Sequence, residues 1–291
     1  MLRRTLIAAT LAAPAIARAQ SWPTAPVRLL VPFSAGGPTD LPARLIADEL
    51  SKSFGQRFVV ENRTGSGVIV ASDAVAKAPK DGQTLLYTTV GHAVARALFP
   101  HLPFDPIADF QPVAHIGRIH NVVMVNKDVP AKTLPELLLA MAGGLDVAHV
   151  AYRGSTAAMP DLLSGHVAMM LDVISSGLPF IQKGETRGLA ITAAQRSPLF
   201  PDLPTVAETI PGDESFTWHM VLAPAGTPPA TVALLNAAIN KVVADPRHRA
   251  TLQGQGMDVV SDSTPASSAA FLQAEITKWE AVIQKAGIKA S

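Results

Sequence analysis

Cysteine is absent from this 291-residue chain, and that absence removes several classes of chemistry at once. Without a thiol the protein has no disulfide, no thiolate ligand for a metal and no cysteine nucleophile. Aromatic residues make up only 5% of the chain and charged residues 16%, well below the usual quarter. The 24 Lys and Arg residues nearly balance the 23 Asp and Glu residues. With no basic field and few aromatic rings for stacking, a nucleic acid partner is excluded.

The chain also has little that could anchor it in a membrane, although it begins with a short apolar stretch. Arg3 and Arg4 precede an Ala/Leu/Ile-rich run that ends at Ala17-Arg18-Ala19. This pattern predicts a signal peptide over residues 1–19, removed on export. A run of about a dozen residues is too short to span a bilayer. We therefore expect a periplasmic protein, exported by either the general secretory or the twin-arginine route.

Motifs for catalysis and cofactor binding are missing as well. The sequence contains no Gly-x-Gly-x-x-Gly or Walker pattern, no His-Glu-x-x-His pair and no Gly-x-Ser-x-Gly elbow. Ser164-Gly165-His166 places a hydroxyl near an imidazole, but no third group orients the base. We expect no cofactor, no metal and no enzyme activity, with a secreted hydrolase as the weakest alternative.

What the sequence does contain is a regular alternation of strand and helix patterns. The near-continuous apolar run at 27–31 is typical of a buried parallel strand, and it is followed by a helix start near Asp40. Further strands are expected at 57–61 and 83–89, with a helix at 68–78 between them. This rhythm predicts a mostly parallel α/β sheet, with ligands bound beyond the carboxyl ends of its strands.

A second set of alternating elements predicts a second domain. The expected elements there are strands at 146–152, 167–173 and 187–192, a helix after Ser155 and a short helix near Phe180. A Pro- and Asp-rich loop at 100–110 and an apolar strand at 122–125 lead into this domain, and a strand at 216–223 leads back to a largely helical segment at 230–285. We expect domain 1 to comprise residues 20–122 and 224–291, and domain 2 to comprise residues 123–223.

The turn after the first strand is the strongest candidate for a binding site. Its residues are Phe33, Ser34, Ala35, Gly36 and Gly37, followed by Thr39 or Asp40 as a candidate helix cap. Glycines here can adopt positive φ and let a ligand approach the main chain, while the free N–H groups of the helix start attract an anion. A tight turn that binds nothing fits the same residues equally well.

Three further positions could complete such a site. Thr88 and Thr89 end the third expected strand, at the edge where ligands bind. In the second domain Ser155 could cap a helix and aim its N–H groups across a cleft. Asp172 ends an apolar strand, where its carboxylate could accept a hydrogen bond from a ligand or cap the next turn.

Seven segments, in order along nearly the whole mature chain, resemble one known family. They are Val31-Pro32-Phe33-Ser34-Ala35-Gly36-Gly37-Pro38-Thr39-Asp40, Val60-Glu61-Asn62-Arg63, Ala76-Lys77-Ala78-Pro79-Lys80-Asp81-Gly82, Phe104-Asp105-Pro106, Tyr152-Arg153-Gly154-Ser155, Asp202-Leu203-Pro204-Thr205-Val206-Ala207-Glu208 and Ala223-Pro224-Ala225-Gly226-Thr227-Pro228. The family is that of the solute receptors of tripartite tricarboxylate transporters, the Bug proteins. The resemblance implies a two-domain, type II-like periplasmic binding fold that closes on a small carboxylate.

The same resemblance implies site residues and a departure from the family pattern. Carried over position by position, it points to Ser34, Gly36, Gly37 and Asp40 with Thr88 and Thr89, faced by Ser155 and Asp172. Relatives usually carry an additional strand, a Gly/Ser-rich loop and a helix before the Tyr152 segment. Here only residues 139–146 intervene, so we expect a second lobe shortened by one βα unit. Val68 also stands where relatives usually show a further glycine.

The resemblance implies partners but leaves two roles open. The main expectation is a monomeric receptor that delivers a small organic acid or amino acid to a membrane permease. The alternative is a sensor that binds the same ligands but docks on a receptor kinase.

Overall fold

The computed structural model describes residues 22–65, 68–144, 147–197 and 200–288, so the expected signal peptide lies outside the described residues. The strands are β1 (Val27–Val31), β2 (Phe58–Asn62), β3 (Thr84–Thr88), β4 (Phe110–Asn126), β5 (Met169–Val173), β6 (Thr186–Ile191), β7 (Phe216–Pro224) and β8 (Met257–Val259). The helices are α1 (Asp40–Phe54), α2 (Ile69–Ala76), α3 (Gly91–Leu98), α4 (Leu134–Ala142), α5 (Ser155–Ser164), α6 (Ile174–Gln182), α7 (Pro229–Ala244), α8 (Pro246–Gly254) and α9 (Pro265–Ala286), with a 3₁₀ helix at Val206–Glu208.

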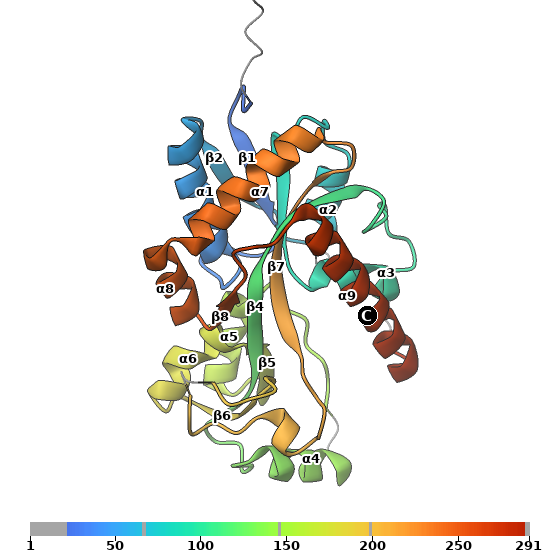
Figure 1. Ribbon diagram of the computed structural model, residues 1–291. Coiled ribbons are helices and arrows are strands. Elements are labelled where there is room, and N and C mark those ends of the chain that lie inside the picture. The colour runs from blue at the N-terminus through green and yellow to red at the C-terminus, as the bar shows by residue number, and fades with distance from the viewer. Residues whose placement is uncertain (1–21, 66–67, 145–146, 198–199, 289–291) are drawn as a thin grey trace, which may run out of the picture.

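Two lobes of unequal size share one long strand. Figure 1 shows a larger upper lobe and a smaller lower lobe, with β4 running through both. The strand order is β2-β1-β3-β7-β4-β5, and β6 and β8 also pair with β4. Residues 110–120 of β4 pair with β7 in the upper lobe, and residues 121–126 pair with β5 and β6 in the lower lobe. The expected two-domain α/β architecture is therefore confirmed.

The expectation of a mostly parallel sheet is wrong. Among the named strands of the described residues, parallel pairing is confined to β2, β1 and β3. β7 pairs antiparallel with both β3 and β4, and β5, β6 and β8 are antiparallel to β4. The sequence pattern of buried strands does not reveal direction. Here the direction is set by β4, which leaves the upper lobe, and by β7, which returns to it.

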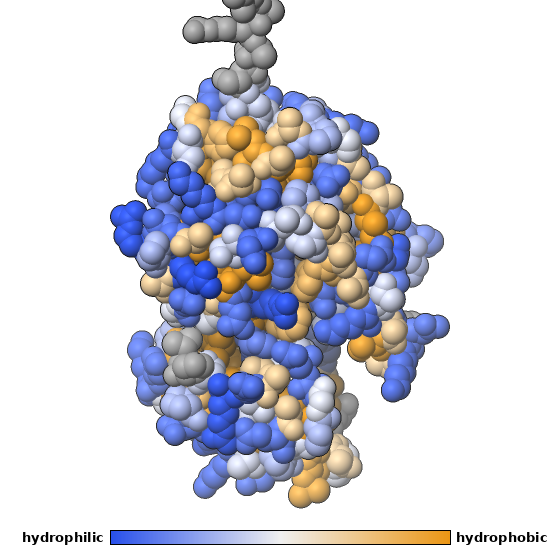
Figure 2. All heavy atoms as spheres, viewed as in Figure 1, coloured by the Kyte–Doolittle hydropathy of each residue, from blue (hydrophilic) through white to orange (hydrophobic). Residues whose placement is uncertain are grey.

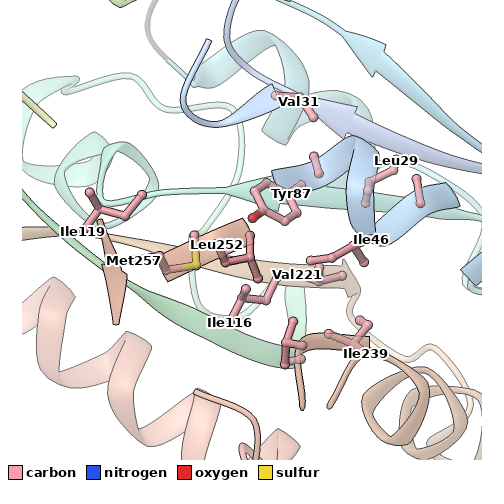
Figure 3. Close-up of a cluster of buried hydrophobic side chains, with 14 of the residues drawn as sticks. Leu29, Val31, Ile46, Tyr87, Ile116, Ile119, Val221, Ile239, Leu252 and Met257 are labelled. Atoms are coloured by element: carbon pink, nitrogen blue, oxygen red, sulfur yellow. The ribbon is translucent and has the colours of Figure 1, made fainter. Parts of the chain in front are cut away.

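Two helical layers cover the upper sheet, because its strands are apolar on both faces. Leu29 and Leu30 in β1 are both buried but belong to opposite cores. The Leu29 side packs with α1, α7 and α8, and Figure 3 shows this cluster with Ile46 of α1 and Ile239 of α7. The Leu30 side packs with α2, α3 and α9, which supply residues such as Ile276. A sheet sandwiched in this way is a rigid platform for the loops at its edge.

The lower lobe has a smaller core around the second part of β4. Val123 and Val125 pack with Leu134 and Leu137 of α4 and with β6. Helices α5 and α6 contact β4 from the other side, through Leu162 among others. Figure 2 shows the two lobes as a broad upper body and a smaller lower one.

The strand expected at 146–152 does not form over its described residues, 147–152. This segment has the pattern of a strand but pairs with no other strand in the described part of the chain, and Val147 and Val150 are exposed. β5 pairs with β4 only, so its other edge has no partner among the described residues. A strand is stable only with a neighbour to bond to, and a local pattern cannot supply one.

Most other local expectations are confirmed with shifts of one to three residues. The strands expected at 57–61, 83–89 and 187–192 appear as β2, β3 and β6, and the helix expected at 68–78 appears as α2. β4 is much longer than the expected strand at 122–125 because it begins at Phe110. Among the described residues, no helix combines the length and hydrophobicity needed to cross a membrane.

Candidate ligand-binding cleft

A cavity of about 780 Å³ lies between the two lobes. Its lining residues include six of the predicted site residues, namely Phe33, Ser34, Gly37, Thr89, Ser155 and Asp172. Four predicted residues do not line it, namely Ala35, Gly36, Asp40 and Thr88. A volume of this size is typical of a small-molecule site.

The double-glycine turn is shaped by a hydrogen bond inside the turn. Gly36 has a φ of 75°, which a side chain would disfavour, and its N–H donates to Oδ2 of Asp40 at 2.8 Å. Gly37 lines the cavity, and a Cβ added there would lie 3.3 Å from the carbonyl oxygen of Ser34. The turn therefore offers main-chain surface at Gly37, while the N–H of Gly36 holds the turn in place.

Asp40 supports the turn from beneath. It is 1% exposed, and Oδ2 also accepts a hydrogen bond from Nε of Arg44 at 2.7 Å. Nδ2 of Asn62 donates to Oδ1 of Asp40 at 2.8 Å and to the carbonyl oxygen of Phe33 at 2.9 Å. Burial alone would raise the pKa of the Asp40 carboxyl, but hydrogen bonds from Arg44, Gly36 and Asn62 together lower it. The carboxylate is thus fully engaged within the upper lobe.

The lower lobe contributes a second carboxylate in a different setting. Asp172 accepts hydrogen bonds from the main-chain N–H of Val173 at 2.8 Å and from Oγ of Ser176 at 2.7 Å, and the nearby Ser155 side chain also favours its charged form. Even so, burial raises the pKa of the Asp172 carboxyl above its usual value. Unlike Asp40, it lines the cavity and has no cationic partner among the described residues.

Ser155 does not act as the expected cap of its helix. α5 begins at Ser155 itself, Gly154 occupies the cap position with a φ of 138°, and the Ser155 side chain lies near enough to Asp172 to favour its charged form. Because both Gly154 and Ser155 line the cavity, the start of α5 still faces it. The helix end is thus directed at the cleft through its main chain.

A third helix start at the cleft had no recognised sequence signal. Helix α3 begins at Gly91, just after Thr89 and Val90, and all three residues line the cavity. Thr88 is completely buried behind them, and its hydroxyl has no hydrogen-bond partner among the described residues. The starts of α1, α3 and α5 therefore meet at one cavity, through Thr39, Gly91 and Ser155 respectively. Three helix N-termini give the part of the cavity that they face a positive potential without a cationic side chain.

The two lobes touch beside the cavity. Oγ of Ser34 donates a hydrogen bond to the carbonyl oxygen of Arg153 at 3.4 Å, linking the double-glycine turn to the segment before α5. A second cavity of about 400 Å³ has a lining that includes Gly36, Leu41 and Phe180, and it shares Gly37, Pro38, Ser155 and Thr156 with the lining of the main cavity.

Side chains that bear charge are scarce around the cavity. Within the part of the chain that the structure describes, its lining contains no Lys or Arg, and Asp172 and His149 are its only acidic and imidazole side chains. The described residues also include no group of three or more His, Cys, Asp or Glu that could hold a metal ion. Binding here depends on main-chain groups, hydroxyls and apolar surface.

The Ser164 and His166 pair does not have the geometry of a catalytic triad. Oγ of Ser164 lies 2.9 Å from Nδ1 of His166, and Oδ1 of Asp161 lies 3.8 Å from the same nitrogen. In a triad the acid and the nucleophile contact opposite nitrogens of the ring. All three side chains are outside the cavity lining, and His166 is exposed.

The apolar wall of the cavity was not predicted from the sequence. Lower-lobe residues before α5 and in or near β5 supply it, including Val147, Val150 and Leu171. The signal that could have revealed this wall is the apolar character of the strands expected at 146–152 and 167–173.

Comparisons with known proteins relate the chain to one class of receptor. The family model described as "Tripartite tricarboxylate transporter family receptor" matches residues 42–141 and 136–288. Protein BugT of Bordetella pertussis is 32% identical over 301 residues, covering 93% of this chain and 92% of that protein.

Two solved structures are similar along their whole length. An R. palustris protein with adipate has a TM-score of 0.88 at 34% identity, covering 93% of this chain and 100% of that chain. MatC from Rhodopseudomonas palustris with bound malate has a TM-score of 0.84 at 33% identity, covering 90% of this chain and 100% of that chain.

Proposed function

The chain belongs to the family of tripartite tricarboxylate transporter receptors, and from this premise we propose that it is a periplasmic receptor for a small carboxylate. It captures an organic acid or amino acid in the cleft and delivers it to the membrane permease of such a transporter. The resemblance stated from sequence motifs is thus confirmed at the level of the family.

The observation that carries the proposal is the meeting of three helix starts at one cavity. The first turns of α1, α3 and α5 approach it from two lobes, through residues 39, 91 and 155. Main-chain N–H groups and aligned helix dipoles favour a carboxylate there. The similar structures with adipate and malate support the same ligand class.

We assign contact with the ligand to the predicted residues that line the cavity. These are Phe33, Ser34, Gly37, Thr89, Ser155 and Asp172. The other four predicted residues act from behind: Ala35, Gly36 and Asp40 shape the turn, and Thr88 lies beneath the start of α3.

We also propose that the lower lobe lacks one βα unit of the family fold. The family model matches in two parts that meet at residues 136–141, next to the apparent gap. The alignment with BugT runs over 301 residues, more than the whole of this chain, so BugT has residues with no counterpart here. The unpaired edge of β5 and the unpaired segment at 147–152, as far as the described residues go, support the same interpretation.

For the domain division we propose residues 20–122 for the first part of domain 1, because β4 changes lobe after residue 120. β7 pairs with β3 and with the upper part of β4. We therefore propose that the chain returns to domain 1 before Phe216, rather than after Ala223. Residues 224–291 also belong to domain 1.

The proposed role has no catalytic step, and the protein acts as a monomer that meets its permease in the periplasm. The alternative is a sensor that docks on a receptor kinase. Deleting the gene distinguishes them: loss of uptake of the bound acid supports transport, whereas normal uptake with a lost transcriptional response supports the sensor.

Binding is tested on the mature chain, residues 20–291, by calorimetry and thermal unfolding with a panel of organic acids and amino acids that includes adipate and malate. A ligand at 100 times its Kd adds about 2.7 kcal/mol to the free energy of unfolding. If no acid binds, the proposed function is wrong.

Gly37→Val locates the carboxylate in the cleft. A side chain at Gly37 crowds the Ser34 carbonyl and covers main-chain surface, so affinity should fall at least tenfold. Gly254→Val is the control, because a Cβ added at Gly254 in α8 would meet no heavy atom of another segment and this glycine lies outside the cavity. Equal affinity in both variants would remove the turn from the site.

A further inference from the structure

The residues that line the cavity fall into two chemically different groups. One group is main chain at the starts of three helices, with Thr89 just before α3. The other group consists of apolar side chains of the lower lobe, with Val147, Val150, Met169 and Leu171 among them. A ligand that fills the cavity therefore meets both polar main chain and apolar side chains.

Three of the apolar side chains that line the cavity are exposed to solvent. Val147 is 45% exposed, Val150 53% and Leu171 56%. Such side chains gain free energy when another apolar group covers them. They line one continuous cavity with the helix starts, so a molecule held by its carboxylate is positioned to cover them.

The cavity offers no cation to a second carboxylate. Within the described residues no Lys or Arg lines it. A second carboxylate lying over Val147, Val150 and Leu171 would lose water without gaining a charged partner, which is costly. The imidazole in the described lining, His149, is exposed to solvent.

We propose that the ligand is a monocarboxylate with an uncharged, largely apolar body, rather than a dicarboxylate. This inference rests on the proposed function, since it concerns the same cleft. The carboxylate lies at the helix starts, and the body extends over Val147, Val150 and Leu171.

Matched pairs of acids test the inference. Calorimetry on the mature chain at pH 8, where imidazoles are generally uncharged, compares hexanoate with adipate and octanoate with suberate. Each monocarboxylate should bind at least tenfold more tightly than its partner. Within the monocarboxylate series, affinity should rise about threefold to fourfold for each methylene that the cavity covers.

The outcomes separate the inference from the proposed function. Tighter binding of adipate and suberate would overturn the inference and leave the receptor function standing. Absence of binding in both series and in the wider acid panel would overturn both.

A charge placed on the apolar wall provides a second test. Leu171→Lys should weaken octanoate binding at least tenfold and should strengthen suberate binding, because a cation then faces the distal carboxylate. Leu234→Lys is the matched control, since Leu234 in α7 is 45% exposed and lies outside the cavity lining. An unchanged ratio of octanoate to suberate affinity in Leu171→Lys would place the ligand elsewhere and overturn the inference.

Discussion

The two lobes bury their parts of the sheet to very different extents. In the upper lobe all five residues of β3 are buried, and helices cover both faces of the sheet. In the lower lobe only one of the five residues of β5 is buried, and one strand edge has no partner among the described residues. The upper lobe is thus a complete α/β layer structure, whereas the lower lobe is a partial one completed by β4. The difference indicates that the upper lobe supplies most of the buried core, whereas in the proposed function the exposed apolar residues of the lower lobe select the ligand.

The largest expected difference between the lobes is in how acid affects their stability. Among the described residues, buried histidines lie only in the upper lobe. Burial lowers the pKa of His92 and His115 to about 4 and that of His219 to about 3. The unfolded chain takes up protons near pH 6.5, so stability is complete above that pH and falls below it. At pH 5 each of these three histidines should lower the free energy of unfolding by about 2 kcal/mol.

Urea unfolding between pH 7 and pH 5 measures this loss, in a range where most carboxylates stay ionised. His92→Gln should reduce the slope of stability against pH, while His166→Gln, at an exposed position, should leave it unchanged. A stability that is flat between pH 7 and pH 5 would contradict the prediction.

The two cleft-side aspartates should respond differently to the same substitution. Asp40→Asn loses an ionised acceptor of bonds from Arg44, Gly36 and Asn62, and should cost about 2 kcal/mol at pH 7. Asp172→Asn removes a charge that burial already disfavours, so stability should stay within about 1 kcal/mol of the wild type. Equal losses in the free energy of unfolding, measured by urea unfolding, would mean that the two carboxylates contribute equally to stability and would contradict the prediction.

The smallest effect is expected where the lobes touch. Ser34→Ala removes a long, exposed hydrogen bond to the Arg153 carbonyl, and should change Kd by less than about threefold. Calorimetry with the acid that the panel identifies checks this value. A tenfold loss would mean that the hydroxyl of Ser34, and not only its main chain, holds the ligand.

Much of the upper lobe could be predicted because its signals are local. The apolar run of β1, the two glycines after it and the helix that follows all lie within residues 27–54. The start of α3 at Gly91 escaped notice, because neither a capping side chain nor a charge marks it.

The lower lobe was predicted less well because its structure depends on distant partners. Asp172 was correctly expected near the end of a strand, but its proximity to Ser155 brings together two elements that a linear pattern cannot place side by side. The segment at 147–152 has the residues of a strand, yet pairing depends on a neighbour elsewhere in the chain.

The position of β7 has a consequence for how the chain matures. β7 lies between β3 and β4 in the sheet, yet it is the last but one strand to be synthesised. Until residue 224 has left the ribosome, the first three strands have no bridge to β4, and α7 and α9 are also missing from the two faces. The upper lobe can therefore become complete only after nearly the whole chain exists, so the growing polypeptide cannot close this sheet during most of its synthesis.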